Sequence, residues 1–369
     1  MPAGIPRLSL VLATLVACTG GGGGGPDPDP GDVDAGSNPS PDAANPSPDA
    51  GPDAPPMVEE LPPLTDGLRT LSGASVPGRV DGIRTIARFN NPVNVATDGA
   101  GGVVVCDFDN GILRRVDASG TATTPITMPT GFARPFGAVR SGTTLFIQTD
   151  RSTAGTATGA LWKIDLATNV ATLVRDNFGR YRGLGVLSDG RLVGAEYLQH
   201  VVSIIDPTTG VATVLAGTPG QSGLVNAGGA DARFSTPYDV VVVPGDDIVV
   251  ADFANHVVRK VSLDGNVVTL AGTGFTSPQG LARGTDGTIY VSDPGAAKIL
   301  AIAASDNAVT TVAGTGTPGY LDDNNPLVAQ LYGLEGIDVS ADGAYLFVAD
   351  GTGGEDVPHH RIRRITLTP

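Results

Sequence analysis

The sequence predicts an all-β domain of repeated four-stranded units, and its composition and one recurring motif carry that prediction. Of 369 residues, 52 are Gly and 29 are Pro, whereas 17% are charged and 5% are aromatic. Such a composition is typical of short strands joined by many tight turns. The motif is a strand-like stretch ending in an acidic residue, then a short turn and a second strand-like stretch. Its copies are VVCDFDNGILRRV (104–116), VGAEYLQHVVSII (193–205), VVADFANHVVRKV (249–261), YVSDPGAAKILAI (290–302) and, with insertions, 146–164 and 347–365.

Each copy is preceded by a stretch with Pro or Gly near its start, and the first five copies are followed by a further β-rich stretch. Four short strands over roughly 40–57 residues are the repeat expected of a β-propeller blade. The sixth copy stops after its third strand, and its missing fourth strand is predicted at residues 68–73, LRTLSG. Pairing these two ends would close the ring and leave no terminal strand edge open. We therefore predict a six-bladed β-propeller over residues 61–369, closed by its N-terminal strand.

The turn of the motif resembles the NHL repeat, which is named for an Asn-His-Leu tripeptide. The closest copy is Asn255-His256-Val257, in which Val replaces the Leu. The resemblance covers about residues 68–369 and implies the same six-bladed propeller. The equivalent pairs in other blades depart from the tripeptide and are Asn110-Gly111, Gln199-His200, Ala296-Ala297 and His359-His360.

The N-terminus has the pattern of an export signal. Arg7 precedes an apolar run, residues 8–16, that is too short to cross a bilayer as a permanent helix. The run ends in LVAC, residues 15–18, which resembles the lipobox of bacterial lipoproteins. The resemblance implies a signal peptide at residues 1–17 and a membrane anchor on a lipidated Cys18. The alternative is a plain secretory signal with an incidental cysteine. Thr19 in place of Asp favours sorting to the outer membrane, so we expect a lipid-anchored protein of the bacterial cell envelope.

Residues 18–60 are predicted to be a disordered tether. The segment is rich in Pro, Gly and Asp, and NPSPDA occurs in it twice. Between residues 19 and 60 there are seven Asp, two Glu and no Lys or Arg. A chain with so few large apolar residues cannot bury enough surface to offset the entropy of ordering. At about 3.1 Å per residue, its upper reach is on the order of 120 Å.

Net charge argues against a nucleic-acid partner. The whole chain carries a formal charge of −15. The tether supplies −9 and Arg7 adds +1, so residues 61–369 hold about −7. A nucleic-acid surface needs a clustered basic excess, and the sequence has none. We expect a monomer that binds no nucleic acid and contacts the membrane through Cys18.

The histidines and the repeated carboxylates are predicted to be structural. His200, His256 and His360 occupy one equivalent position in different blades, and blades radiate from the axis, so these side chains diverge. Carboxylates at the end of the second strand can accept turn N–H groups or pair with the following strand's Arg. Those residues are Asp107, Glu196, Asp252, Asp293 and Asp350.

A binding site is expected on one face of the ring, near its axis. The long insertions, at 72–89, 149–160, 216–234, 313–332 and 350–360, all join strands at the same face of a propeller. Alternatively, these insertions only pack on each other. The first strands place one residue pair per blade near the axis, with Leu184-Gly185 expected in the third blade. Candidate ligand contacts are Asn94, Arg134, Arg182, Tyr238, Asp239, Gln279 and Glu335.

These features predict a binding module for a protein, peptide or glycan without a cofactor, and they favour a non-catalytic role. The alternative is an enzyme, because six-bladed relatives include calcium-dependent lactonases, which use Glu, Asn and Asp around the axis, and zinc lyases, which use channel histidines. Glu335, Asn94 and Asp239 keep the lactonase alternative open, although Glu335 is one residue out of step with the other two. No His lies on a first strand, which disfavours the lyase. A third possibility is a structural Ca²⁺ ion at Asp322 and Asp323.

Overall fold

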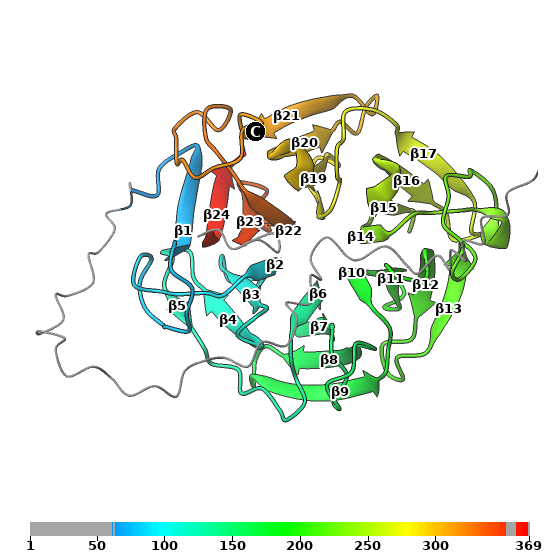
Figure 1. Ribbon diagram of the computed structural model, residues 1–369, viewed down its shortest axis with the longest axis horizontal. Helices are drawn as coiled ribbons and strands as arrows, with labels where there is room; N and C mark the ends of the chain where they lie inside the picture. The colour runs from blue at the N-terminus through cyan, green and yellow to red at the C-terminus, as the bar shows by residue number, and fades with distance from the viewer. Residues whose placement is uncertain (1–60, 62, 352–358, 368–369) are drawn as a thin grey trace, which may run out of the picture. The chain divides into compact units, whose positions relative to one another are not determined.

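The computed structural model describes residues 61, 63–351 and 359–367, and these residues form six four-stranded antiparallel sheets around a central axis (Figure 1). This confirms the predicted six-bladed propeller. The predictions for residues 1–17 and for most of 18–60 lie outside the described residues. No helix in the described part of the chain is long and apolar enough to cross a membrane.

The blades follow one another along the chain, and each runs from an inner first strand to an outer fourth strand. Blade 1 is β2 (Pro92–Thr97), β3 (Val103–Asp107), β4 (Ile112–Val116) and β5 (Ala122–Thr123). Blade 2 is β6 (Pro135–Ser141), β7 (Thr144–Thr149), β8 (Ala160–Asp165) and β9 (Val170–Asp176). Blade 3 is β10 (Tyr181–Val186), β11 (Leu192–Glu196), β12 (Val201–Ile205) and β13 (Ala212–Ala216).

The remaining blades repeat the pattern. Blade 4 is β14 (Pro237–Val242), β15 (Ile248–Asp252), β16 (Val257–Val261) and β17 (Val267–Ala271). Blade 5 is β18 (Leu281–Arg283), β19 (Ile289–Asp293), β20 (Lys298–Ile302) and β21 (Val309–Ala313). Blade 6 is β22 (Gly333–Val339), β23 (Tyr345–Gly351), β24 (His360–Thr366) and β1 (Leu68–Ala74). Side chains buried between neighbouring blades form the core, so each blade depends on the next for its apolar contacts.

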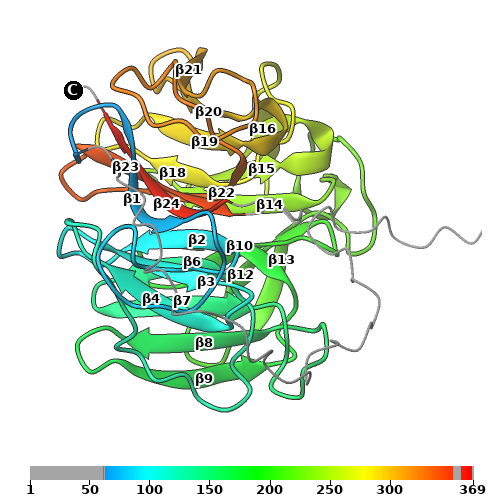
Figure 2. The ribbon, with the colours of Figure 1, turned by 60° about the vertical axis from the view of Figure 1, so that its left-hand side comes forward.

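The N-terminal strand closes the ring, as predicted. β1 pairs antiparallel with β24, the last strand of the chain, with Leu68 opposite Ile365 and Gly73 opposite Arg361. The blue and red strands lie side by side in both views (Figures 1 and 2). The pairing leaves β24 covered on both edges, by β23 and β1, so the chain ends present no open inner edge.

The second-strand carboxylates hold the turns that follow them, which confirms their structural assignment. Asp252 accepts the Ser235 N–H at 2.7 Å through Oδ1, and the Asn255 amide at 2.8 Å through Oδ2. Its Oδ2 also pairs with Arg259 at 2.9 Å, and both side chains are fully buried. Asp107 and Asp350 make the same kinds of contact in their blades.

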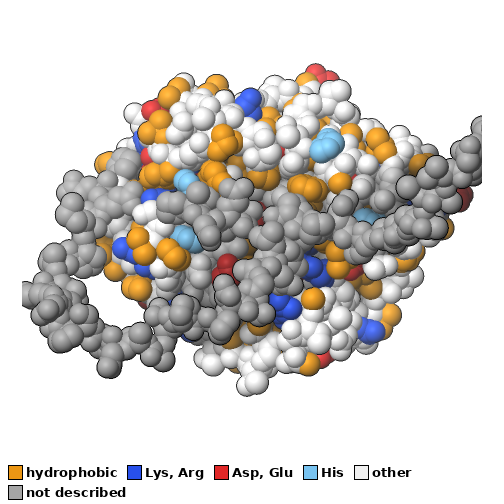
Figure 3. Space-filling model, in the orientation of Figure 1, with side chains coloured by type: hydrophobic (Ala, Val, Ile, Leu, Met, Phe, Trp, Pro, Cys, Tyr) orange, Lys and Arg blue, Asp and Glu red, His pale blue; other side chains and the backbone are white. Residues whose placement is uncertain are grey.

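The histidines join each blade to the next one. Nδ1 of His200 accepts the Thr236 N–H at 3.0 Å, and Nδ1 of His360 accepts the Asn91 N–H at 2.9 Å. His256 Nδ1 also contacts the next blade, but its partner is the Thr276 carbonyl oxygen, so this imidazole nitrogen donates instead of accepting. The pale-blue histidines accordingly appear at separate places around this face of the ring (Figure 3). Structural contacts between blades therefore account for the repeated histidine position.

Three of the long insertions wrap around a buried arginine from the third strand of their blade. The arginines are Arg114, Arg259 and Arg363, and each is fully buried. One guanidinium nitrogen donates to the carboxylate at the end of the second strand. The other donates to a backbone carbonyl of the insertion and to the side chain of the residue that follows that carbonyl. These last side chains are Asp81 at 2.6 Å, Asn226 at 2.6 Å and Asp322 at 2.7 Å. Each of the insertions at 72–89, 216–234 and 313–332 is therefore fixed to its blade by a buried arginine and belongs to the folded scaffold.

Candidate functional site

A ring of six side chains, one per blade, lies where the first strands open toward the loop-rich face; we call it the mouth ring. Each member follows the residue that pairs with the end of the second strand, as Tyr238 follows Pro237, the partner of Asp252. In blade 3 Tyr181 is the partner of Glu196, so the member is Arg182. The residue pair nearest the axis in blade 3 is therefore Arg182-Gly183. The prediction of Leu184-Gly185 at this position is wrong by two residues. The mouth ring comprises Val93, Phe136, Arg182, Tyr238, Gln279 and Glu335.

Polar contacts cross the mouth ring through the Tyr238 hydroxyl. Arg182 Nη1 lies 3.3 Å from that hydroxyl, which in turn lies 3.5 Å from Glu335 Oε2. Side chains of blades 3, 4 and 6 are thereby brought together, although 153 residues separate Arg182 from Glu335 in the chain. All three are nearly buried, with exposed fractions of 4%, 5% and 8%.

Asp150 supports the ring from blade 2. Its Oδ2 accepts from Arg180 Nη2 at 2.7 Å and from Arg182 Nη2 at 3.0 Å, and all three side chains are buried. Two guanidinium groups on one carboxylate fix the direction of Arg182 across the mouth. Asp150 was missed by sequence reasoning because it lies one residue beyond the repeated acidic position, which Thr149 occupies in blade 2.

Aromatic rings surround Arg182. Its guanidinium carbon lies 4.0 Å from the ring centroid of Phe136, 5.1 Å from Tyr197 and 5.5 Å from Tyr238. Phe136 and Tyr238 meet edge to face with centroids 5.7 Å apart. A cation held among aromatic faces is a favourable and rigid arrangement. The mouth ring therefore combines a fixed charge, aromatic surface and acceptor oxygens.

The remaining predicted contacts divide between the ring and its surroundings. Gln279 belongs to the mouth ring and is 8% exposed. Arg134 lies outside the mouth ring. Its guanidinium carbon is 4.8 Å from the centroid of the Phe108 ring, and its Nη2 is 3.3 Å from Asp109 Oδ1. Asn94 and Asp239 lie one residue further along their strands, where the blades come closest. A Cβ added at Gly336 would lie 2.8 Å from Asn94 Cα, and one at Gly183 would lie 2.4 Å from Asp239 Cα, so only glycine fits there.

Below that constriction, a cavity of about 280 Å³ is lined by residues of all six first strands, including Asn94, Asp239 and Asp338. None of its lining residues belongs to the mouth ring. Asp239 Oδ2 accepts the Leu281 N–H of the next blade at 2.8 Å, and Asp338 Oδ2 accepts the Thr97 N–H at 2.7 Å. Both carboxylates thus join neighbouring blades from inside the channel. Asp338 was not among the predicted site residues.

Enclosure by protein raises the pKa of Asp239 to about 7, and the charge of Asp338 adds to the rise, whereas the N–H groups of Leu281 and Val240 oppose it. Asp239 is half-buried by exposed area, and its side chain lines the channel cavity. The pKa of Asp338 is raised by the same burial.

The raised pKa predicts a pH-dependent difference between the protein and its Asp239→Asn variant. A carboxyl whose folded pKa exceeds its unfolded value of 3.8 contributes stability that is present at low pH and is lost as pH rises toward 7. We therefore expect the variant to gain stability relative to the native protein as pH rises from 3.8 to about 7, with no further gain at higher pH, measured by urea unfolding. Asp189→Asn, at an exposed carboxyl whose pKa is lowered, is the control. Parallel pH curves for native and Asp239→Asn proteins would contradict this assignment.

The candidate calcium residues in the 313–332 insertion are already engaged. Asp322 Oδ1 pairs with Arg363 at 2.7 Å and Oδ2 accepts the Thr70 N–H at 2.8 Å, while Asp323 Oδ1 accepts the Asn325 N–H at 2.7 Å. Among the described residues, no three His, Cys, Asp or Glu side chains gather closely enough to hold a metal ion. The segment 352–358 of the last insertion lies outside the described residues.

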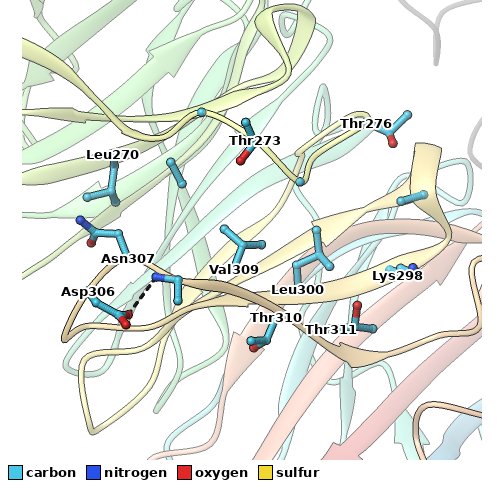
Figure 4. A pocket seen from close by; sticks show the side chains of 15 residues that line it. Leu270, Thr273, Thr276, Lys298, Leu300, Asp306, Asn307, Val309, Thr310 and Thr311 are labelled. Atoms are coloured by element: carbon cyan, nitrogen blue, oxygen red, sulfur yellow. Dashed lines mark hydrogen bonds between the residues drawn. The ribbon is translucent and has the colours of Figure 1, made fainter.

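A larger hollow, of about 760 Å³, lies on the outer rim between blades 4 and 5 (Figure 4). Its two charged residues, Lys298 and Asp306, lie at opposite ends of the hollow, and Asp306 is occupied with the Ala308 N–H at 3.0 Å. Most of its other lining side chains are small, aliphatic or Thr. Because its polar groups do not converge, we place the candidate site at the mouth ring instead.

Comparison with known proteins identifies the fold class, the β-propeller, without a closer assignment. No family model matches the sequence, and no curated protein matches it. Among solved structures, the chain resembles a protein of unknown function from Bacteroides thetaiotaomicron VPI-5482, with TM-score 0.65, 17% identity, and 81% and 75% of the two chains covered. An auxiliary nutrient-binding protein from Bacteroides ovatus ATCC 8483 gives TM-score 0.62, 15% identity, and 82% and 77% coverage. A streptogramin B lyase gives TM-score 0.53, 13% identity, and 82% and 97% coverage.

Proposed function

We propose that this propeller is a binding module whose ligand, a protein, peptide or glycan, is held at the mouth ring. The observation that carries the proposal is the convergence of Arg182, Tyr238 and Glu335 from three blades on one point near the axis. Side chains on rigid inner strands are held in place before a ligand arrives, which lowers the ordering cost of binding. The likeness to a nutrient-binding protein supports a binding role for the fold.

The test uses the full chain with Cys18→Ser, applied to a glycan array and to a peptide array. At least one array should retain the protein. Tyr238→Phe removes the hydroxyl that joins Arg182 to Glu335 and should weaken retention about fivefold to tenfold. Tyr290→Phe, on β19 outside the mouth ring, should leave retention unchanged. Retention on neither array, or equal retention by both variants, would contradict binding at the mouth ring.

The N-terminus supports a proposal for where the module acts. We infer that the chain is an exported lipoprotein of NHL-repeat type, anchored through Cys18 to the cell envelope, with the acidic tether extending the propeller from the outer membrane. The lipobox-like LVAC at residues 15–18 supports this. Palmitate labelling in a bacterial host should be lost in Cys18→Ser, and labelling that persists in this variant would sink the idea.

An enzyme at the axis remains the alternative, supported by the likeness to a streptogramin B lyase and by Asp239 in the channel. Glu335 faces Tyr238 in the mouth ring, whereas Asn94 and Asp239 line the cavity below it. The three lactonase-like residues thus lie in two different layers. A Ca²⁺-dependent rise in melting temperature that Asp239→Ala abolishes would favour the enzyme over the binding module.

A further inference from the structure

Within the part of the chain that the structure describes, two buried oxygen acceptors at the mouth ring have no hydrogen-bond partner. They are Oδ1 of Asp150 and Oε1 of Gln279, on side chains that are 4% and 8% exposed. A buried acceptor left without a donor destabilises the folded protein, so native structures rarely keep one without a use. The two atoms therefore indicate which groups a ligand at this site has to supply.

The two acceptors lie on either side of Tyr238. The Asp150 carboxylate is held against Arg182, the blade 3 member of the ring, and Gln279 is the blade 5 member. Tyr238, the blade 4 member, stands between them. In the order of the blades around the axis, one acceptor-bearing side chain therefore lies on each side of Tyr238.

The charges around the acceptors balance. Arg180 and Arg182 carry two positive charges, and Asp150 and Glu335 carry two negative ones, with Asp150 shared by both arginines. A site with no net charge gives an ionic ligand no advantage and favours a neutral one. The aromatic rings of Phe136 and Tyr238 beside it favour a ligand with apolar faces.

We propose that the ligand is a neutral saccharide, whose hydroxyl groups donate to Asp150 Oδ1 and Gln279 Oε1 while its C–H faces contact the Phe136 and Tyr238 rings. This inference rests on the proposed binding function and names its ligand class. A pyranose carries several adjacent hydroxyl donors on an apolar ring, which matches two acceptors around an aromatic group. A peptide backbone supplies one donor and one acceptor per residue, and its carbonyls would compete for the Arg182 and Tyr238 donors, which are already engaged.

The test measures binding of neutral disaccharides (cellobiose, maltose, lactose and N,N′-diacetylchitobiose) and of a neutral glycan array by the full chain with Cys18→Ser. Gln279→Met removes one acceptor at nearly constant volume and should raise Kd about tenfold. Asp150→Asn should also weaken binding. Gln199→Met, at an exposed glutamine outside the mouth ring, is the matched control and should bind like the parent protein.

Other outcomes separate this inference from the proposed function. Binding of a peptide that Tyr238→Phe weakens, without binding of any neutral glycan, overturns the saccharide and keeps the binding module. Binding of acidic glycans alone also overturns it. If Asp150→Asn unfolds the protein because Arg180 and Arg182 lose their partner, Gln279→Met still decides, and unchanged glycan affinity in that variant overturns the inference.

Discussion

Replacing Arg363 with Met is expected to lower the free energy of unfolding by about 3–5 kcal/mol. Arg363 is fully buried and pairs with Asp350 at 2.6 Å and with Asp322 at 2.7 Å, so its removal leaves two carboxylates without their counter-charge. Asp350 is itself completely buried and cannot recover hydration without moving. The loss should appear as a lower urea midpoint, because the same arginine ties the 313–332 insertion to blade 6.

The matched control is Arg191→Met. Arg191 pairs with Asp189 at 2.7 Å, a contact as short as those of Arg363, but both side chains are about half exposed. An exposed pair of this kind contributes about 1 kcal/mol or less. Adding Asp350→Asn to Arg363→Met should recover part of the loss, because it removes the buried charge. Equal destabilisation by the two arginine variants would show that burial does not set the value of these pairs.

Much of the fold could be predicted because a propeller repeats its local pattern. The strand, acidic residue, turn and strand recur with only small changes, and the incomplete sixth copy required a strand from elsewhere. The stretch LRTLSG, residues 68–73, lies before the first repeat and supplies that strand. The number of strands in the repeats therefore predicted the closure of the ring, which the pairing of β1 with β24 confirms. The same repetition predicted that the histidines diverge, which His200 and His360 do by holding different neighbouring blades.

The candidate site was harder to predict because it depends on register across the axis. In blade 3 the pairing of the first and second strands shifts between Tyr181 and Gly183. YRGLGV, residues 181–186, also contains two glycines, so the repeat pattern predicts Gly185 near the axis where the structure has Gly183. Asp150 lies one residue beyond the repeated acidic position of blade 2, so comparison of the repeats does not identify it. Its role depends on Arg180 and Arg182 of the next blade, a contact that no local pattern shows.

Removing the closing strand should have the largest effect of all. A chain that begins at residue 75 lacks β1, whose residues are all buried and include the fully buried Leu68 and Leu71. Each of these leucines alone accounts for about 2–5 kcal/mol when cut back to Ala. Their sum, with the lost pairing along β24, approaches the whole stability of a typical domain, about 5–15 kcal/mol. We therefore expect no cooperative melting transition from this shortened chain.

A chain that begins at residue 61 keeps β1 and should melt like the full protein, which separates the closing strand from the segment before it. Adding a peptide of residues 61–74 to the chain from 75 should restore a cooperative transition in a concentration-dependent way, because the peptide would pair with β24 as a separate molecule. Leu71→Ala in that peptide should weaken the restoration, because Leu71 is fully buried. Val76→Ala in the chain that begins at residue 61 is the control and should leave melting unchanged, because Val76 is exposed. If the chain from 75 instead melts cooperatively at the temperature of the full protein, five complete blades and three strands suffice, and β1 only covers an edge that the ring can leave open.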